Sequence, residues 1–124
     1  MYYSALDLLA CPKCKHHPLE LYVIEEARVE KEVEISQTPF CSLYCGYRKT
    51  RVDELAEPPC YECLKREVIA GILVCRSCGA WYPISRGIPV MLVEEKLRKK
   101  PVQMFLEKYG DKIPVELREL VKSG

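Results

Sequence analysis

The chain has 124 residues, which predicts one domain and leaves little room for a second. Apolar residues make up 48% and charged residues 30%, which excludes a disordered or membrane-embedded chain. The 19 Lys and Arg residues nearly balance the 18 Asp and Glu residues, so the formal charge of +1 argues against nucleic-acid binding by charge alone. The first seven residues have neither a basic start nor a long apolar run, so we expect no signal peptide and a cytoplasmic location.

The N-terminal third begins with a helix signal and continues with a strand signal. Ser4 is a candidate helix cap, with Asp7 in the place of the usual glutamate of a capping box. The short helix that follows has to end before Pro12. Residues 19–24 alternate between apolar and polar, which predicts a strand, and a weaker period of two predicts a strand or hairpin extension over residues 25–35.

The second half contains three apolar runs of strand length. Residues 68–74 form a β-rich run that predicts a buried strand, and residues 80–84 predict another short one. Gly87 suits a turn that needs a positive φ. A last strand is expected over residues 88–93, where its proline restricts it to a sheet edge.

The tail is expected to be helical. Val102, Phe105, Leu106 and Tyr109 recur with the spacing of one helix face, and the glycine that follows can end that helix. A second short helix is expected after the proline at position 114.

The eight cysteines fall into four close pairs, and a reducing cytosol disfavours disulfides between them. The first and last pairs each enclose two residues, the spacing at which a tight turn directs two sulfurs at one tetrahedral ion. Four thiolates leave no open coordination position, which suits a structural zinc ion, and iron is the alternative because it uses the same ligands. The first predicted zinc site is therefore Cys11, Cys14, Cys75 and Cys78.

The two inner pairs lie in a long segment with almost no periodic pattern, which needs something to order it. Metal binding would supply that order, because the binding free energy becomes folding free energy. The second predicted zinc site is therefore Cys41, Cys45, Cys60 and Cys63. The alternative for this set is cysteines that are unliganded or joined by disulfides.

The sequence contains no motif for catalysis. It has no phosphate-binding glycine-rich loop, no nucleophile elbow and no histidine-rich site with an open metal position. The first cysteine pair has the Cys-Pro-x-Cys form of redox proteins, but the residues before it look helical rather than strand-like and a matching pair follows downstream. We therefore expect no catalysis by this chain alone.

Two segments carry a resemblance to a known family. Residues 8–14 read Leu-Leu-Ala-Cys-Pro-Lys-Cys, and residues 82–92 read Tyr-Pro-Ile-Ser-Arg-Gly-Ile-Pro-Val-Met-Leu. Together they strongly resemble the small zinc-binding activator subunit of class I methyltransferases, of the archaeal and eukaryotic type. The similarity covers about residues 1–24 and 68–95. The insertion between these segments holds four cysteines where eukaryotic members carry a helical lobe.

This resemblance implies a non-catalytic subunit that forms heterodimers with S-adenosylmethionine-dependent methyltransferases and keeps them soluble and active. Their substrates are tRNA, rRNA and translation release factors, so RNA is reached through the partner. In the family, the strand after the Gly-Ile-Pro turn extends the sheet of the partner, and an exposed apolar edge strand suits that use. The implied contact strand is Ile88, Pro89, Val90, Met91, Leu92 and Val93.

The expected fold is α+β, with a small zinc ribbon, a short antiparallel sheet, a cysteine-rich insertion lobe and terminal helices. The ribbon would span residues 1–24 plus 68–95, the insertion lobe 25–67 and the helical tail 96–124. The alternative function is a nucleic-acid-binding zinc ribbon of the transcription or translation machinery. That alternative requires one basic face formed by Arg48, Lys49, Arg51, Lys96, Arg98, Lys99 and Lys100.

Overall fold

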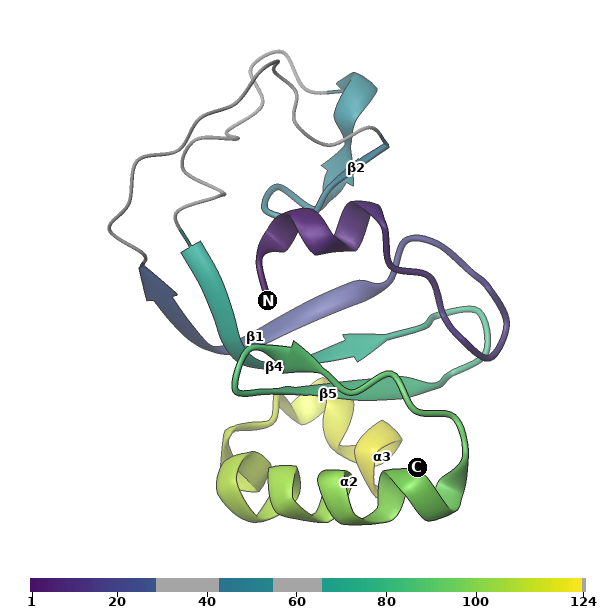
Figure 1. The fold of residues 1–124 in the computed structure, drawn as a ribbon, viewed down its shortest axis with the longest axis vertical. Helices are drawn as coiled ribbons and strands as arrows, with labels where there is room; N and C mark the ends of the chain where they lie inside the picture. Colours follow the sequence, from purple (N-terminus) through teal and green to yellow (C-terminus); the bar gives the residue numbers. More distant parts are fainter. Residues whose placement is uncertain (29–42, 55–65, 124) are drawn as a thin grey trace.

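The protein is built as an antiparallel sheet between two covering layers (Figure 1). The fold is that of a computed structural model, which describes residues 1–28, 43–54 and 66–123. The sheet has the strand order β1 (Glu20–Arg28), β4 (Arg66–Val74), β5 (Trp81–Ser85) and β6 (Ile88–Pro89). The predicted α+β class with a short antiparallel sheet is confirmed.

Strand β4 lies in the middle of the sheet and is buried on both faces, as its apolar run predicted. Its side chains alternate, so Leu73 faces one layer while Ile72 and Val74 face the other. Gly71 lets β1 approach closely, because a Cβ there would lie 2.5 Å from the carbonyl oxygen of Tyr22. The sequence run therefore forms the strand on which both hydrophobic cores are assembled.

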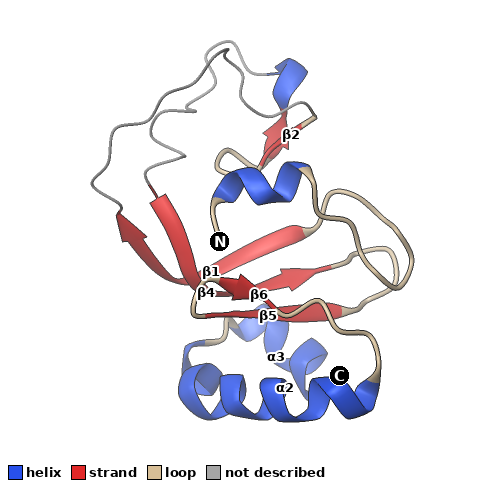
Figure 2. Cartoon of the chain, in the orientation of Figure 1, coloured by secondary structure: helices blue, strands red, loops and turns tan. Residues whose placement is uncertain are grey.

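The first layer consists of the 3-10 helix η1 (Tyr3–Asp7), the hairpin of β2 (Tyr44–Cys45) and β3 (Thr50–Arg51), and the short η2 (Val52–Glu54) (Figure 2). The α-amino group of Met1 donates hydrogen bonds to the carbonyls of Val68 and Gly87, which fixes the start of the chain to the sheet. The buried residues of this core are Met1, Tyr3, Leu6, Cys11, Leu19, Leu21, Val68, Leu73, Cys75, Tyr82 and Ile84.

The predicted capping box at the N-terminus is wrong. The residue that precedes η1 is Tyr2, and no side chain among the described residues caps the helix. The carboxylate of Asp7 accepts hydrogen bonds from the backbone N–H groups of Leu43 (2.6 Å) and Tyr44 (2.8 Å) instead. Asp7 therefore joins η1 to the β2 strand, far away in sequence, which no local pattern could reveal.

The second layer is made by α2 (Glu95–Tyr109), η3 (Gly110–Lys112) and α3 (Val115–Ser123), which cover the opposite face of the sheet (Figure 1). The predicted stripe packs as expected, with Phe105 buried against Trp81 and Tyr109 buried against Phe105. The buried residues of this second core are Ala70, Ile72, Val74, Trp81, Phe105, Tyr109, Ile113, Leu117 and Val121. No helix within the described ranges is long and apolar enough to cross a bilayer.

The predicted strand over residues 88–93 is too long, because β6 contains only Ile88 and Pro89. The N–H of Val90 still donates to the carbonyl of Pro83, but the chain then turns toward α2. Arg98 of α2 donates to the carbonyl of Leu92, which holds this segment beside the helix. The expected extension over residues 25–35 is confirmed as far as Arg28, where β1 ends, and its remainder lies outside the described residues.

Replacing Phe105 by alanine is expected to lower the free energy of unfolding by about 3–5 kcal/mol, the usual cost of emptying a buried aromatic site. The fluorescence of Trp81, the one tryptophan of the chain, should report the loss directly because the two rings lie 6.4 Å apart. Met104→Ala, at an exposed position on the same helix, is the control and should change stability by less than about 0.5 kcal/mol. Equal effects of the two variants would contradict the packing of α2 on the sheet.

Candidate metal centre

The two outer cysteine pairs lie on turns with the same backbone conformation. In the first turn, the N–H of Lys15 donates to the carbonyl of Cys11 at 2.7 Å. In the second, the N–H of Gly79 donates to the carbonyl of Cys75 at 2.9 Å. Both donors directly follow the second cysteine of their pair and have left-handed φ values, 68° for Lys15 and 77° for Gly79. Two distant segments therefore present their sulfurs in equivalent ways.

Each turn is held by the elements beside it. The first turn follows η1, and the N–H of Cys11 donates to the carbonyl of His16. The second turn joins β4 to β5, and the N–H of Cys75 donates to the carbonyl of Ala80. The sheet and the N-terminal loop thus fix the positions of both pairs.

The structure brings together the four sulfurs of the first predicted site. All four Sγ atoms lie within 4.8 Å of one another, and this group is Cys11, Cys14, Cys75 and Cys78. The Sγ atoms of Cys11 and Cys78 are 3.7 Å apart, and those of Cys14 and Cys75 are 3.4 Å apart. A tetrahedron with zinc–sulfur bonds of about 2.3 Å has sulfurs about 3.8 Å apart. The separations therefore suit one tetrahedral ion, and they are too long for disulfides, whose sulfurs lie about 2.05 Å apart.

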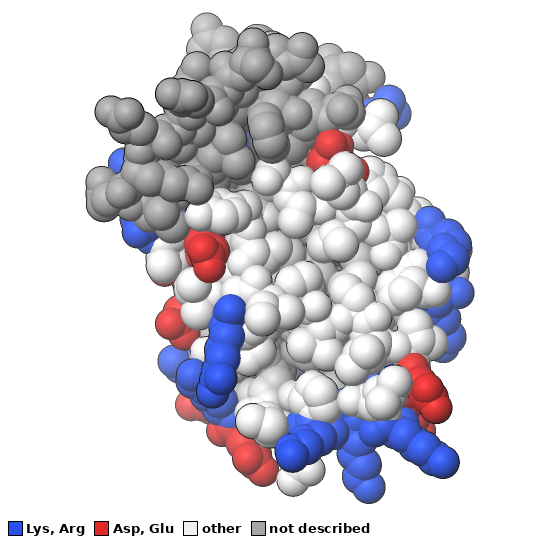
Figure 3. Space-filling model, viewed as in Figure 1, with Lys and Arg blue, Asp and Glu red and all other residues white. Residues whose placement is uncertain are grey.

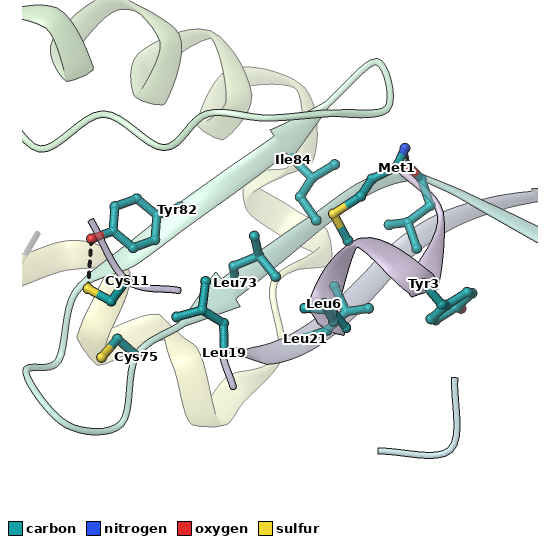
Figure 4. Close-up of a cluster of buried hydrophobic side chains, with 11 residues drawn as sticks. Met1, Tyr3, Leu6, Cys11, Leu19, Leu21, Leu73, Cys75, Tyr82 and Ile84 are labelled. Carbon is teal, nitrogen blue, oxygen red and sulfur yellow. Dashed lines mark hydrogen bonds between the residues drawn. The ribbon is translucent and has the colours of Figure 1, made fainter. Parts of the chain in front are cut away.

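The site is half covered by protein. Cys11 and Cys75 are fully buried, whereas Cys14 and Cys78 are exposed at the surface. Figure 4 shows the hydroxyl of Tyr82 directed at the Cys11 sulfur, a contact of 3.2 Å. This hydrogen bond connects the cluster to the first hydrophobic core, of which Tyr82 is a member.

The pKa values of the two buried thiols are shifted in opposite directions. Burial raises the pKa of the Cys11 thiol, but the hydrogen bonds from the Tyr82 hydroxyl and from nearby backbone N–H groups outweigh burial, so this pKa lies below its usual range. At Cys75 burial dominates and raises the pKa of the thiol. Because a metal binds thiolates, both sulfurs would be deprotonated with an ion bound.

Four thiolates around one ion form a closed site. Zinc with four sulfur ligands has no free position for water or substrate, so the arrangement suits a structural role rather than catalysis. The residues present are thus positioned to bind one metal ion and to hold the N-terminal loop against the β4–β5 turn.

Three members of the second predicted site lie outside the described residues. These are Cys41, Cys60 and Cys63. The fourth, Cys45, is buried at the end of β2, in the layer next to η1. The second site therefore stays a prediction.

A family model described as Trm112p-like protein matches residues 3–87, well over half of the chain. The chain belongs to the Trm112p-like family. This family comprises activator subunits of methyltransferases, which confirms the resemblance. No curated protein gives a match.

The match to the Trm112p-like family covers all eight cysteines and ends at Gly87. The predicted contact strand at residues 88–93 therefore begins directly after the matched region. The helices α2 and α3 lie beyond it as well.

The basic residues required by the nucleic-acid alternative do not form one face. Arg48, Lys49 and Arg51 belong to the β2–β3 hairpin, in the layer of η1. Residues 96–100 belong to α2, on the opposite side of the sheet (Figure 1). The sheet lies between the two groups, so the single basic face that the nucleic-acid alternative requires is not formed.

The two left-handed positions provide a test of the turn geometry. Gly79→Ala should lower the free energy of unfolding by about 1–2 kcal/mol, because a side chain there disfavours a left-handed φ. No atom of the described residues lies within 4 Å of the added Cβ, so the expected cost is conformational. The reciprocal variant Lys15→Gly should maintain or raise stability, by up to about 1 kcal/mol. Denaturant unfolding at a fixed excess of zinc measures both effects, and destabilisation of similar size in both variants would contradict the equivalence of the turns.

Proposed function

We propose that the chain is a non-catalytic subunit that activates S-adenosylmethionine-dependent methyltransferases acting on tRNA, rRNA or translation factors. The observation that carries this proposal is membership of the Trm112p-like family over residues 3–87. The closed four-sulfur site supports it, because such a site stabilises a fold and leaves no position for substrate. In this proposal the partner supplies the cofactor pocket and the methyl-transfer chemistry.

An uncharged surface at the sheet edge supports binding to a protein. Strand β6 lies at one end of the strand order, so its outer backbone groups face no other strand in the described part of the chain. Ile88 and Val93 are 64% and 45% exposed, and Met91 and Leu92 are partly exposed beside them. Figure 3 is viewed from the same side as Figure 2, in which β6 lies in front. It shows a broad surface without charged side chains, and most lysines, arginines and acidic residues lie around its rim.

The proposed mode of binding is strand addition by residues 88–93. An edge strand offers unpaired backbone groups for affinity and alternating side chains for specificity. Since only Ile88 and Pro89 form a strand in the isolated chain, the partner would have to extend β6 by drawing residues 90–93 into the joint sheet. Activation then results from ordering the partner and covering its apolar surface.

The remaining parts of the proposal concern metal, domains and location. Zinc is the preferred ion at the four outer cysteines, and a second zinc ion is proposed at the inner four. The proposed division is a ribbon of residues 1–24 plus 68–95, an insertion of residues 25–67 whose two ends continue strands β1 and β4, and a helical tail of residues 96–124. The heterodimer would be cytoplasmic and would reach RNA through the methyltransferase.

The edge surface is tested by changing its apolar side chains to lysine. Ile88→Lys and Met91→Lys should each weaken binding to the methyltransferase partner by about tenfold or more, since both place a charge in an apolar contact. Val115→Lys is the matched control, because Val115 is 76% exposed but lies at the start of α3, on the other side of the sheet. The measurement is titration calorimetry with the partner, identified by affinity purification and mass spectrometry.

Zinc content should stay the same in all three variants, which separates loss of contact from loss of fold. Methyl transfer by the purified partner should fall when the wild-type chain is omitted. An absence of any methyltransferase among the captured proteins, or activity that is independent of the chain, would overturn the proposed function. Normal binding by Ile88→Lys and Met91→Lys would overturn the contact surface only.

A further inference from the structure

Helix α2 carries two apolar stripes, and only one of them is buried within the described part of the chain. The stripe that contains Phe105 and Tyr109 packs in the second core. Leu97, Pro101 and Met104 follow one another at steps of four and three residues, so they share a different face of the same helix. Leu97 and Met104 are 56% and 57% exposed, and none of the three belongs to either described core. We call this second face the outer stripe of α2.

The outer stripe begins next to the segment that is proposed to contact the partner. Arg98 donates to the carbonyl of Leu92 at 3.0 Å, so the first turn of α2 lies against residues 88–93. The same guanidinium lies over two aromatic rings of β5, at 5.4 and 5.5 Å from their centres. At the other end of the helix, the Tyr109 hydroxyl donates to the Glu25 carboxylate of β1. The helix therefore starts at the β5–β6 side of the sheet and ends at β1, and the exposed surface of the sheet edge continues onto the start of α2 (Figure 2).

Pro101 adds a backbone acceptor to the outer stripe. A proline inside a helix has no N–H for the carbonyl four residues earlier. In α2 this carbonyl belongs to Leu97, and it is directed along the helix axis toward Pro101. The face therefore presents two exposed apolar side chains with a carbonyl between them that lacks its usual helical donor. A surface that covers this face can both bury apolar area and donate a hydrogen bond.

The charges of α2 indicate the chemistry of the complementary surface. The helix contains five basic residues and two acidic ones, so it is positive overall. Lys100 is exposed and lies three residues after Leu97 and four before Met104, which places it beside both. Lys108 is exposed as well, one turn beyond Met104. The surface that fits the outer stripe is therefore an apolar groove with carboxylates at its edge.

The width of the outer stripe favours a protein over a membrane as its binding partner. A helix that lies on a membrane inserts a wide apolar face, whereas the larger apolar face of α2 is already buried on the sheet. Anchors at positions i, i+4 and i+7 are the pattern with which a helix binds in the groove of another protein.

We propose that the outer stripe of α2 docks into an apolar groove, bordered by acidic side chains, on the same protein that binds along residues 88–93. The identity of that protein as a methyltransferase rests on the proposed function. The partner then holds two adjoining surfaces, the sheet edge and the helix. The helix lies beyond residue 87, where the match to the family ends, so this second contact is made by the part of the chain outside the matched region.

The test measures the affinity of the zinc-loaded full chain for the methyltransferase that the wild-type chain captures from cells. Leu97→Glu and Met104→Glu should each weaken binding about tenfold or more in titration calorimetry, since a carboxylate enters an apolar, acid-bordered contact. Gln103→Glu is the matched control and should bind within about twofold of wild type. It introduces the same charge at an exposed position of α2, but Gln103 is next to Met104 in sequence and so lies on another face. Lys100→Gln should weaken binding severalfold at low salt and much less at high salt.

Further measurements separate loss of contact from loss of fold and protein from membrane. Zinc content and helical circular dichroism should be unchanged, because the substituted side chains are exposed. Met104→Gln, which is uncharged and suits a helix, should still weaken binding about threefold or more. Vesicles of phosphatidylserine and phosphatidylcholine should bind the wild-type chain and Leu97→Glu equally weakly.

The possible failures point to different parts of the account. Normal binding by Leu97→Glu and Met104→Glu, or equal weakening by Gln103→Glu, would overturn the docking of α2 and leave the proposed function in place. Vesicle binding by the wild-type chain that Leu97→Glu abolishes would assign the stripe to a membrane and overturn the proposal in the same way. A wild-type chain that captures no methyltransferase would overturn the proposal together with the proposed function.

Discussion

The convergence of four sulfur atoms on one point is the constraint on which the first layer of the fold depends. The contacts between Cys14 and Cys75 and between Cys11 and Cys78 join residues 61 and 67 positions apart. They fasten the N-terminal loop to the turn between the two central strands. The Tyr82 hydroxyl carries this connection into the core, where it meets the side chains that cover the sheet. An ion at this point would convert its binding free energy into stability of the whole layer.

The second covering layer lies beyond the residues that the family model matches. Helices α2 and α3 cover the face that contains Trp81, and Arg98 connects α2 with both the aromatic rings and the carbonyl of Leu92. The segment proposed to contact the methyltransferase is thus held by a helix rather than by a long strand.

The sequence predicted those features that depend on local spacing. The two Cys-x-x-Cys turns, the buried run of β4 and the apolar stripe on α2 each follow from short-range patterns, and each was found. The role of Asp7 could not be predicted, because its carboxylate bonds backbone N–H groups of Leu43 and Tyr44 from a distant segment.

The end of β6 and the separation of the basic residues depend on tertiary structure as well. Residues 88–93 have the composition of a strand, but β6 ends at Pro89 and Arg98 of α2 donates to the carbonyl of Leu92. The β2–β3 hairpin and α2 both carry clustered basic residues, but the sheet lies between them. Patterns of single residues do not say which face of a sheet a later segment will cover.

The most direct test of the account is the metal content of a chain whose outer four cysteines are intact and whose inner four are replaced by serine. This variant carries Cys41→Ser, Cys45→Ser, Cys60→Ser and Cys63→Ser, and it is purified at neutral pH and dialysed before elemental analysis by mass spectrometry. The account predicts one zinc ion per folded chain, bound by the outer set. A folded chain without metal would contradict it, because the fold would then form with no ion bound to the four outer cysteines.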